Sequence, residues 1–328
     1  MLKPINMIRN AVRAKARRTT CSVKPLGAIL LALLMTLSSP VAAQDFQKGL
    51  AAFNAGDYVT ALQEWTPLAE AGDSSAQNNL GFMYNNGQGV PQDYAEAMKW
   101  YRLAADQGWA SAQNNLGFMY NNGQGVPQDY AEAAKWHRLA ADQGNAQAQH
   151  NLGFMYENGQ GVPQDYAEAA KWYRLAADLG YANAQYNLGL MYWNGQGVPQ
   201  DYAEAAKWYR LAADLGYVDA QYNLGFMYWN GQGVPQDDKE AVKWYRLAAD
   251  QGYANAQYNL GLMYGQGMGV LQDNVMAHMW LNIASANGAD EAGGWRDEIG
   301  EKMTPADISK AQAMARECMS SGYTKCGG

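Results

Sequence analysis

The sequence predicts an all-α protein, a solenoid of stacked helix-turn-helix repeats. The first observation behind this prediction is a segment that begins at Ala76 and recurs with few changes at a spacing of 36 residues. The second is that each copy contains two stretches of apolar residues at helical spacing, separated by a glycine-rich loop. A single helical hairpin cannot bury its apolar stripe, so the copies must stack on one another.

The first helix of each unit is predicted from the spacing of its apolar residues. In the first copy, Leu80, Met83 and Tyr84 recur at helical spacing. The run breaks at residues 86–89, where two glycines permit the backbone angles that a helix end requires. Pro91 follows and cannot extend the helix because it has no backbone N–H. The first helix therefore ends at this loop.

The second helix is predicted to begin after Asp93, which has the residue type and position of an N-cap. Glu96 lies three residues later and is expected to complete a reciprocal capping box. Gly108 is expected to end the helix. The apolar stripe of this helix contains Ala97, Trp100, Tyr101, Ala104 and Ala105.

The repeat has the spacing A-x3-L-G-x2-Y-x2-G-x-G-V-x2-D-x3-A-x2-W-x3-A-A-x2-G, which resembles the Sel-one-like repeat, a relative of the tetratricopeptide repeat with a longer inter-helix loop. The matching positions of the first copy are Ala76, Leu80, Gly81, Tyr84, Gly87, Gly89, Val90, Asp93, Ala97, Trp100, Ala104, Ala105 and Gly108. The resemblance implies a right-handed superhelical α-solenoid whose first helices line the concave surface.

The domain organisation follows from the register of the copies. Residues 44–75 are expected to form an N-terminal tetratricopeptide-like capping hairpin with a shortened inter-helix loop, and residues 292–328 to form C-terminal capping helices and a tail. In the latter, Thr304 is the expected N-cap of the last helix and Pro305 its first residue. Terminal units must differ from the others because one of their faces meets water. The six predicted repeats span residues 76–111, 112–147, 148–183, 184–219, 220–255 and 256–291.

The N-terminal segment, residues 1–43, predicts a secretory signal peptide. It carries seven basic residues and no acidic one, and an apolar run follows from Leu26 to Leu37. Small residues then lead to Ala43, after which cleavage is expected. The alternative is an uncleaved N-terminal anchor, although the run is short for a bilayer. The expected location is the periplasm or the exterior of a bacterial cell.

The charge balance excludes some partners. The chain has 24 basic and 31 acidic residues, and loss of the seven basic residues of the signal leaves 17 against 31, a net charge of −14. Nucleic acid and anionic membrane surfaces are poor partners for this balance. No other stretch of the sequence is apolar enough to cross a membrane, so no membrane insertion is expected after cleavage.

The cysteines agree with an exported protein. Cys21 belongs to the predicted signal, which leaves Cys318 and Cys326 as a pair. In an oxidising compartment we expect a disulfide between them, and the alternative is two unpaired thiols near the C-terminus.

Candidate binding residues emerge from a comparison of the copies with one another, because a few positions vary within an otherwise fixed pattern. Two such positions lie seven residues apart on the first helix and share a face. They predict a concave groove that is lined by amides at its N-terminal end and by aromatic residues, typical of binding hot spots, at its C-terminal end. The candidate partner-binding residues are Asn78, Asn85, Asn114, Asn121, His150, Glu157, Tyr186, Trp193, Tyr222, Trp229 and Tyr258.

The alternative for these aromatic residues is packing against the neighbouring repeat. Variation among the copies favours a surface position, whereas aromatic size favours partial burial. Two invariant amides per repeat, Gln77 and Asn79 in the first copy, could hold a peptide backbone or cap internal groups, and we favour the internal role. A further varied position is expected to pack between repeats, at Trp109, Asn145, Tyr181, Tyr217 and Tyr253.

The sequence predicts no catalytic, cofactor or metal site. His137, His150 and His278 occupy three different registers of the repeat with no cysteine near them, which excludes a regular zinc motif. Neither G-x-S-x-G nor S-x-x-K occurs. The acidic residues recur in nearly every copy, whereas a catalytic residue should be singular.

The functional expectation is a non-catalytic exported scaffold that binds a partner protein or peptide through its concave face. The resemblance to Sel-one-like repeat proteins implies an adaptor or regulator of the bacterial envelope, or a protein of host contact. One alternative is a cell-wall glycan-binding module that uses the aromatic end as a stacking platform. A less favoured alternative is an enzyme, either β-lactamase-like or a cell-wall hydrolase.

Overall fold

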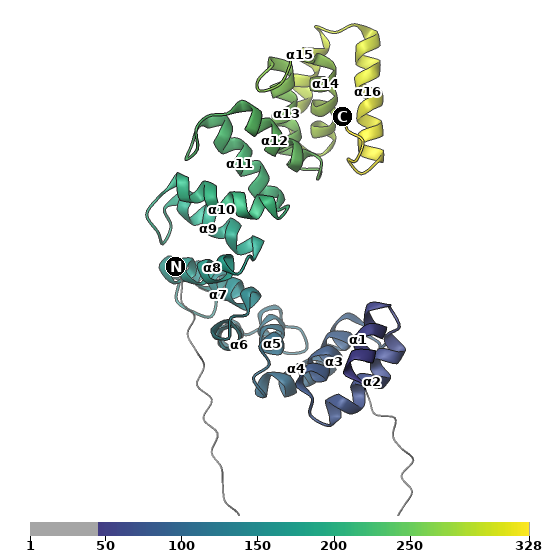
Figure 1. The fold of residues 1–328 in the computed structure, drawn as a ribbon, viewed down its shortest axis with the longest axis vertical. Helices are drawn as coiled ribbons and strands as arrows, with labels where there is room; N and C mark the ends of the chain where they lie inside the picture. Colours follow the sequence, from purple (N-terminus) through teal and green to yellow (C-terminus); the bar gives the residue numbers. More distant parts are fainter. Residues whose placement is uncertain (1–44, 328) are drawn as a thin grey trace, which may run out of the picture. The chain divides into compact units, whose positions relative to one another are not determined.

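The computed structural model describes residues 45–327, which form sixteen α-helices and no strand (Figure 1). The predicted signal peptide and the cleavage after Ala43 lie outside the described residues. The helices are α1 (Phe46–Asn54), α2 (Tyr58–Glu70), α3 (Ser74–Asn86), α4 (Tyr94–Asp106), α5 (Ala110–Asn122), α6 (Tyr130–Asp142), α7 (Ala146–Asn158), α8 (Tyr166–Asp178), α9 (Ala182–Asn194), α10 (Tyr202–Asp214), α11 (Val218–Asn230), α12 (Asp238–Ala249), α13 (Ala254–Gln266), α14 (Asn274–Ala286), α15 (Ala292–Gly300) and α16 (Pro305–Ser320).

The fold is the predicted right-handed α-solenoid. Helices α3 to α14 form six hairpins at the 36-residue period, α1 and α2 precede them, and α15 and α16 follow. The first helix of the first full repeat begins at Ser74, and the side chain of Asp73 caps it by accepting a hydrogen bond from the backbone N–H of Ala76 at 2.8 Å. The sequence pattern placed the start at Ala76 because that residue is the first of the helix to be buried.

The second helices begin at the predicted N-cap, but the capping box is only half formed. The carboxylate of Asp93 accepts hydrogen bonds from the backbone N–H groups of Ala95 and Glu96, at 2.9 and 3.1 Å. The backbone N–H of Asp93 donates instead to the carbonyl oxygen of Tyr84, at 2.9 Å. Glu96 forms an ion pair with Lys99 at 3.1 Å. The reciprocal part of the predicted box is therefore wrong, since the end of the first helix satisfies the donor that Glu96 would have taken.

Within a repeat, a glycine on the first helix faces a bulky side chain on the second helix. A Cβ atom at Gly81 would lie 2.6 Å from Cδ1 of Tyr101, whose side chain is buried. Ala97 and Ala104 are also fully buried beside it. Small residues on one helix thus let a large ring on the other fill the space between them, which gives the close packing of a protein interior.

Loop glycines bring the backbone of one repeat against the backbone of the preceding one. At Gly161 φ is +69°, and a Cβ atom there would lie 2.0 Å from the carbonyl oxygen of Tyr130 in the preceding repeat. No side chain can move aside to relieve such a contact. Glycine is therefore required at this position both by backbone conformation and by space.

Arginines of the second helices connect successive repeats. Arg102 donates a hydrogen bond from Nη2 to Oη of Tyr120 at 2.6 Å, and its guanidinium lies 4.9 Å from the ring centroid of Trp136. Both partners belong to the next repeat. The arrangement recurs at Arg138, Arg174 and Arg210. A cation over an indole face contributes about 0.5 to 2 kcal/mol, so each junction gains a specific polar contact that sequence analysis did not predict.

The C-terminal helices cover the last repeat. Trp280 and Ile283 of α14 are fully buried. Helix α16 begins as predicted, because Oγ1 of Thr304 accepts a hydrogen bond from the backbone N–H of Asp307 and Pro305 occupies the first turn. Among the described residues, no helix combines the length and the hydropathy needed to cross a membrane.

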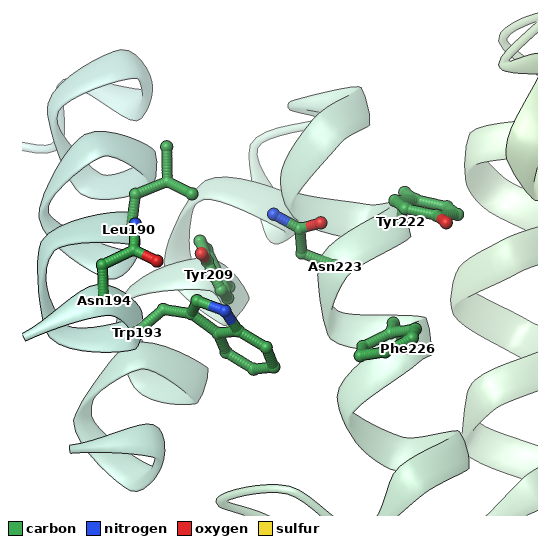
Figure 2. A pocket seen from close by; sticks show the side chains of 7 residues that line it. All are labelled: Leu190, Trp193, Asn194, Tyr209, Tyr222, Asn223 and Phe226. Atoms are coloured by element: carbon green, nitrogen blue, oxygen red, sulfur yellow. The ribbon is translucent and has the colours of Figure 1, made fainter. Parts of the chain in front are cut away.

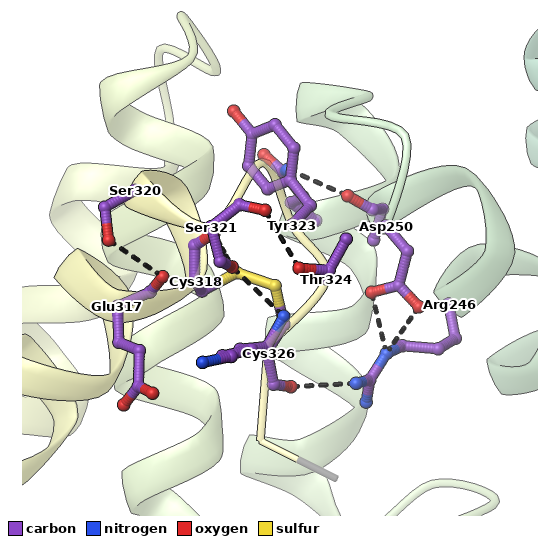
Figure 3. Close-up of a disulfide and its surroundings, with 12 residues drawn as sticks. Arg246, Asp250, Glu317, Cys318, Ser320, Ser321, Tyr323, Thr324 and Cys326 are labelled. Atoms are coloured by element: carbon purple, nitrogen blue, oxygen red, sulfur yellow. Dashed lines mark hydrogen bonds and ion pairs between the residues drawn. A yellow bond between two sulfur atoms is a disulfide. The ribbon is translucent and has the colours of Figure 1, made fainter.

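The tail after α16 is held by a disulfide between Cys318 and Cys326, the pair that the sequence predicts (Figure 3). The carbonyl oxygen of Cys326 accepts a hydrogen bond from Nη2 of Arg246 at 2.8 Å. Asp250 in turn accepts a hydrogen bond from Nε of Arg246 at 3.0 Å. The disulfide thereby joins the tail to α16, and Arg246 holds it against the end of α12.

Candidate binding surface

The eleven candidate residues lie on the first helices of the six repeats, and the structure leaves all but one of them partly accessible. The exception is Asn114, whose side chain is only 3% exposed. Its Oδ1 lies 3.1 Å from Nδ1 of His137 and accepts a hydrogen bond from Asn151 at 3.2 Å. The expectation that Asn114 is an exposed contact residue is wrong, because the shorter His137 ring draws its amide inward.

The invariant asparagines bind the varied residue of the preceding repeat. Nδ2 of Asn115 donates to Oδ1 of Asn78 at 3.2 Å, and Nδ2 of Asn187 lies 3.1 Å from Nε2 of His150. Asn151 makes the same contact with Asn114, as described above. This geometry supports the internal role of the asparagine ladder over direct capture of a peptide backbone.

The invariant glutamines link consecutive helix ends. Nε2 of Gln77 donates to the carbonyl oxygen of Ala69 at 2.9 Å, and Oε1 of Gln77 accepts from Nε2 of Gln107 at 2.7 Å. In two repeats the position of Gln107 is taken by leucines, Leu179 and Leu215, which are 60% and 61% exposed. The buried Oε1 atoms of the corresponding Gln149 and Gln185 have no hydrogen-bond partner within residues 45–327.

The varied aromatic residues are both packed and accessible. The ring of Tyr186 lies 4.9 Å from Tyr217, and the ring of Tyr222 lies 5.1 Å from Tyr253, measured between centroids. Each pair joins the first varied position to the position that precedes the next repeat. Packing against the neighbouring repeat and exposure at the surface therefore both apply, since one side of each ring packs and another side stays accessible.

The position that precedes each repeat is expected to pack against the neighbouring repeat. It does so only where the residue opposite it has a ring. Trp109 is 39% exposed, which contradicts the prediction. The residue of its repeat that corresponds to Tyr186 is Asn78, which offers no ring to stack on. Asn145 instead caps α7, because its Oδ1 accepts a hydrogen bond from the backbone N–H of Ala148 at 2.9 Å.

Four cavities open along the first helices in the same register of the repeat. Each has walls from two successive first helices and a floor from the second helix between them, and we name each by its floor residue. The Trp65, Tyr101, His137 and Tyr209 cavities have volumes of about 110, 170, 260 and 290 Å³. Six candidate residues line three of them, namely Asn85, Asn114, Asn121, His150, Trp193 and Tyr222.

The Tyr209 cavity is the most aromatic of the four (Figure 2). Trp193 reaches across from α9 toward Phe226 on α11, with ring centroids 6.2 Å apart. Tyr209 lies between the two helices, and Asn223 flanks it from α11. Its full lining is Leu190, Trp193, Asn194, Tyr209, Tyr222, Asn223 and Phe226, none of which is charged.

The remaining candidates have partners within the chain. Oη of Tyr173 donates a hydrogen bond to Oε2 of Glu157 at 2.6 Å. Oη of Tyr258 donates to Oε2 of Glu291 at 3.1 Å, at the start of the C-terminal cap. Asn78, Tyr186 and Trp229 line none of the four cavities named above. The structure thus concentrates the predicted strip into separate cavities.

The floor residues were not among the candidate binding residues, because the sequence pattern indicates that their rings belong to the core. Burial raises the pKa values of Tyr101 and Tyr209 and lowers the pKa of His137 to about 4. These three side chains are therefore uncharged at neutral pH. The sequence did offer one indication that this position varies, because His137 stands where four other repeats have tyrosine.

Replacement of His137 by tyrosine is expected to remove a component of acid destabilisation. The buried ring has a pKa of about 4, whereas an unfolded histidine has a pKa near about 6.5. The unfolded chain therefore binds the proton first, so stability falls as the pH drops from about 6.5 to 4, by about 3 kcal/mol at most. Urea unfolding at pH 7.5 and 4.5 should show a pH dependence smaller by about 2 to 3 kcal/mol in His137→Tyr. Identical pH dependence in the two proteins would contradict this assignment.

The fold and the row of cavities define an α-solenoid repeat protein, a class that generally serves as a scaffold for protein interactions. The Sel1 repeat matches residues 74–109, 110–145, 146–181, 182–217, 218–253 and 254–288. The chain therefore belongs to the Sel1 repeat family. The matched segments begin where α3, α5, α7, α9, α11 and α13 begin.

One solved structure agrees with this assignment, and a second resembles the chain in sequence. The crystal structure of a Sel1 repeat protein from Oxalobacter formigenes is 34% identical, with a TM-score of 0.65, and the match covers 74% of this chain and 97% of that one. A protective antigen present in uropathogenic Escherichia coli strains, which displays an SLR fold, is 28% identical with a TM-score of 0.47, and 85% of each chain is covered. No curated protein matches the chain.

Proposed function

We propose that this protein is an exported, non-catalytic scaffold that binds a partner protein through the row of cavities on its first helices. The observation that carries the proposal is the common register of the four cavities, which offers a partner segment a series of similar but chemically distinct recesses. Six of the eleven varied candidate residues line these recesses, while the scaffold between them is constant. Affinity and selectivity would then reside in the varied residues.

Export to the periplasm or the exterior is supported by the basic and apolar character of residues 1–43. The disulfide between Cys318 and Cys326 also suits an oxidising compartment. The proposed role of such an exported scaffold is that of an adaptor or regulator in the bacterial envelope, or of a protein in host contact.

The proposal of a non-catalytic protein is supported by the lack of charge on the cavity floors and by the structural roles of nearby acidic residues. The three titratable floor residues are uncharged at neutral pH. Asp93 caps α4 and Glu96 pairs with Lys99, and Asp129, Glu132 and Lys135 do the same in the next repeat. These acidic groups are engaged in holding helices and are not presented to a substrate as an acid and base pair.

A capture experiment tests the proposal. The mature chain, residues 44–328, is immobilised beside a variant with Trp193→Ala, Tyr222→Ala and Trp229→Ala, and both are exposed to envelope extract. A matched control carries alanine at Leu103, Leu139 and Leu247, which are 42, 47 and 41% exposed on the second helices. The captured protein is then purified and its affinity measured for all three chains, after circular dichroism has shown equal helix content.

We expect the parent and the control to bind the purified partner with equal affinity and the triple aromatic variant to bind it about 100-fold more weakly, since an aromatic hot-spot residue commonly contributes 2 kcal/mol or more. Equal affinity of the aromatic variant and the parent would refute binding through this surface.

A glycan-binding module is the second candidate, and the cluster of Trp193, Tyr222 and Trp229 favours it because sugars stack on aromatic rings. A glycan ligand predicts that replacement of Trp193 and Trp229 alone abolishes binding. A protein ligand should also be weakened by changes at Asn78, Asn85 and Asn121, in the amide-lined repeats. Asn114 is left out of this comparison because it is buried.

A further inference from the structure

Two consecutive repeats carry the same buried tyrosine with different partners. In one repeat, Oη of Tyr173 donates a hydrogen bond to the carboxylate of Glu157 on the preceding first helix, at 2.6 Å. In the next repeat the same position is Tyr209, but Trp193 replaces the glutamate. The indole packs against Tyr202, with centroids 4.9 Å apart, and against Phe226. Among the described residues, the side chain of Asn223 lies close enough to Oη of Tyr209 to donate to it, but none replaces the carboxylate as acceptor of its proton.

The missing partner leaves space as well as an unused donor. Tyr209 forms the floor of a cavity of about 290 Å³, and Trp193 forms part of its wall (Figure 2). Burial raises the pKa of Tyr209, so its hydroxyl keeps its proton across the neutral range. The chain therefore presents a buried O–H donor at the bottom of an open aromatic recess.

On the basis of the proposed function, we propose that the Tyr209 cavity binds the carboxamide side chain of a glutamine from the partner protein. The carbonyl oxygen of that side chain would accept the hydrogen bond from Tyr209 Oη, at the place that the Glu157 carboxylate occupies beside Tyr173. Glutamine has nearly the same shape as glutamate, so its carboxamide matches the group that the tyrosine hydroxyl contacts one repeat earlier.

A neutral amide fits the cavity better than a carboxylate. The seven lining residues carry no charge, and the whole chain is acidic, with a net charge of −7. A carboxylate brought in from a separate partner would lose its hydration without gaining a cation. A glutamine offers the same acceptor without that cost.

The rim of the cavity supplies the complementary groups. Asn194 and Asn223 line it from the two first helices, and their side-chain oxygens can accept hydrogen bonds from an NH₂ group. Leu190 and Phe226 provide apolar surface for the methylene groups of a glutamine. The cavity is larger than one glutamine side chain, which leaves room for part of the partner main chain.

The test uses three capped amino acids as probes: N-acetylglutamine N-methylamide and its glutamate and leucine counterparts. Binding to the mature chain is measured by ligand-observed NMR titration at neutral pH. Tyr209→Phe removes only the hydroxyl, whereas Trp193→Glu recreates the pair formed by Glu157 and Tyr173 within the chain. Tyr173→Phe is the matched control, because that hydroxyl is already occupied by Glu157.

We expect the glutamine probe to bind the parent and Tyr173→Phe with a Kd on the order of 1 mM. Loss of one neutral hydrogen bond should weaken binding to Tyr209→Phe by about fivefold, and Trp193→Glu should not bind the probe. The glutamate and leucine probes should bind the parent at least about fivefold more weakly than the glutamine probe.

Three results would overturn the proposal. The first is no binding of the glutamine probe at a concentration on the order of 50 mM, 50-fold the expected Kd. The others are equal affinity for the leucine probe and tighter binding of N-acetylglucosamine in the same assay.

The capture experiment separates this inference from the proposed function. If Tyr209→Phe binds the purified partner as the parent does while the triple aromatic variant does not, the glutamine assignment fails and the scaffold function stands. If the triple variant binds as the parent does, the scaffold function itself fails.

Discussion

Replacement of Gly161 by alanine is expected to lower the free energy of unfolding by about 4 kcal/mol, from backbone strain and overpacking together. The residue has a φ of +69°, which costs a non-glycine residue about 1 to 2 kcal/mol. The added Cβ would also lie 2.0 Å from the carbonyl oxygen and 2.3 Å from the carbonyl carbon of Tyr130. Because these are backbone atoms, the two repeats must move apart.

Urea denaturation followed by far-ultraviolet circular dichroism measures this effect. Gly180→Ala is the matched control, since Gly180 has a φ of +84° but no heavy atom within 4 Å of its would-be Cβ. The control should cost only about 1 kcal/mol, from backbone conformation alone. Equal losses in the two variants would show that the contact between repeats has no part in the effect.

Truncation after Gly288 is expected to produce an aggregating protein. It removes α15, α16 and the disulfide, and so uncovers the side of α14 on which Met279, Trp280 and Ile283 are fully buried. A contiguous apolar surface of this kind promotes association, and solenoids need a polar outer face on their terminal units. Size-exclusion chromatography with light scattering measures the outcome.

The control for this truncation is an internal deletion of residues 182–217, one full repeat. Because Tyr181 and Tyr217 occupy equivalent positions, the new junction preserves the register and both terminal caps. We expect this shortened chain to stay soluble and to elute as the parent does, apart from its smaller size. A truncated chain that is soluble, monomeric and unfolds cooperatively would disprove the need for the cap.

The helices and their ends could be predicted from the sequence because local chemistry determines them. Asp93 caps its helix through its own side chain, and a glycine in the left-handed conformation ends each first helix, as Gly87 does with a φ of 67°. Both effects act within a few residues along the chain. Their recurrence at a fixed period also identified the stacked architecture.

The contacts between repeats could not be predicted, because one copy of the pattern does not show what lies beside it. Arg102 was left without a role, yet it joins Tyr120 and Trp136 of the next repeat. The capping box failed for the same reason on a smaller scale, since the N–H of Asp93 is satisfied by Tyr84 from the other helix. Such pairings depend on how two helices are docked.

The candidate surface was predicted as a continuous strip, and the structure divides it into cavities. Variation among the repeats pointed to the first helices, along which the four cavities open. It could not show that Asn114 is drawn inward by His137, nor that Trp193 turns toward Phe226 and leaves Tyr209 without an acceptor. Side-chain direction is set by neighbours in the adjoining repeat, which no single helix pattern contains.

The two leucines that replace the bridging glutamine, Leu179 and Leu215, have a consequence for how the protein opens. The stability of a solenoid is the sum of the stabilities of its repeats and of the interfaces between neighbouring repeats, so local stability can differ from one repeat to another. At Gln149 and Gln185 a buried oxygen lacks its partner, at a cost of about 1 to 3 kcal/mol each. Because each missing contact lies within its own repeat, residues 148–183 and 184–219, these two adjacent repeats form a region of low local stability in the middle of the stack and should open before the repeats on either side.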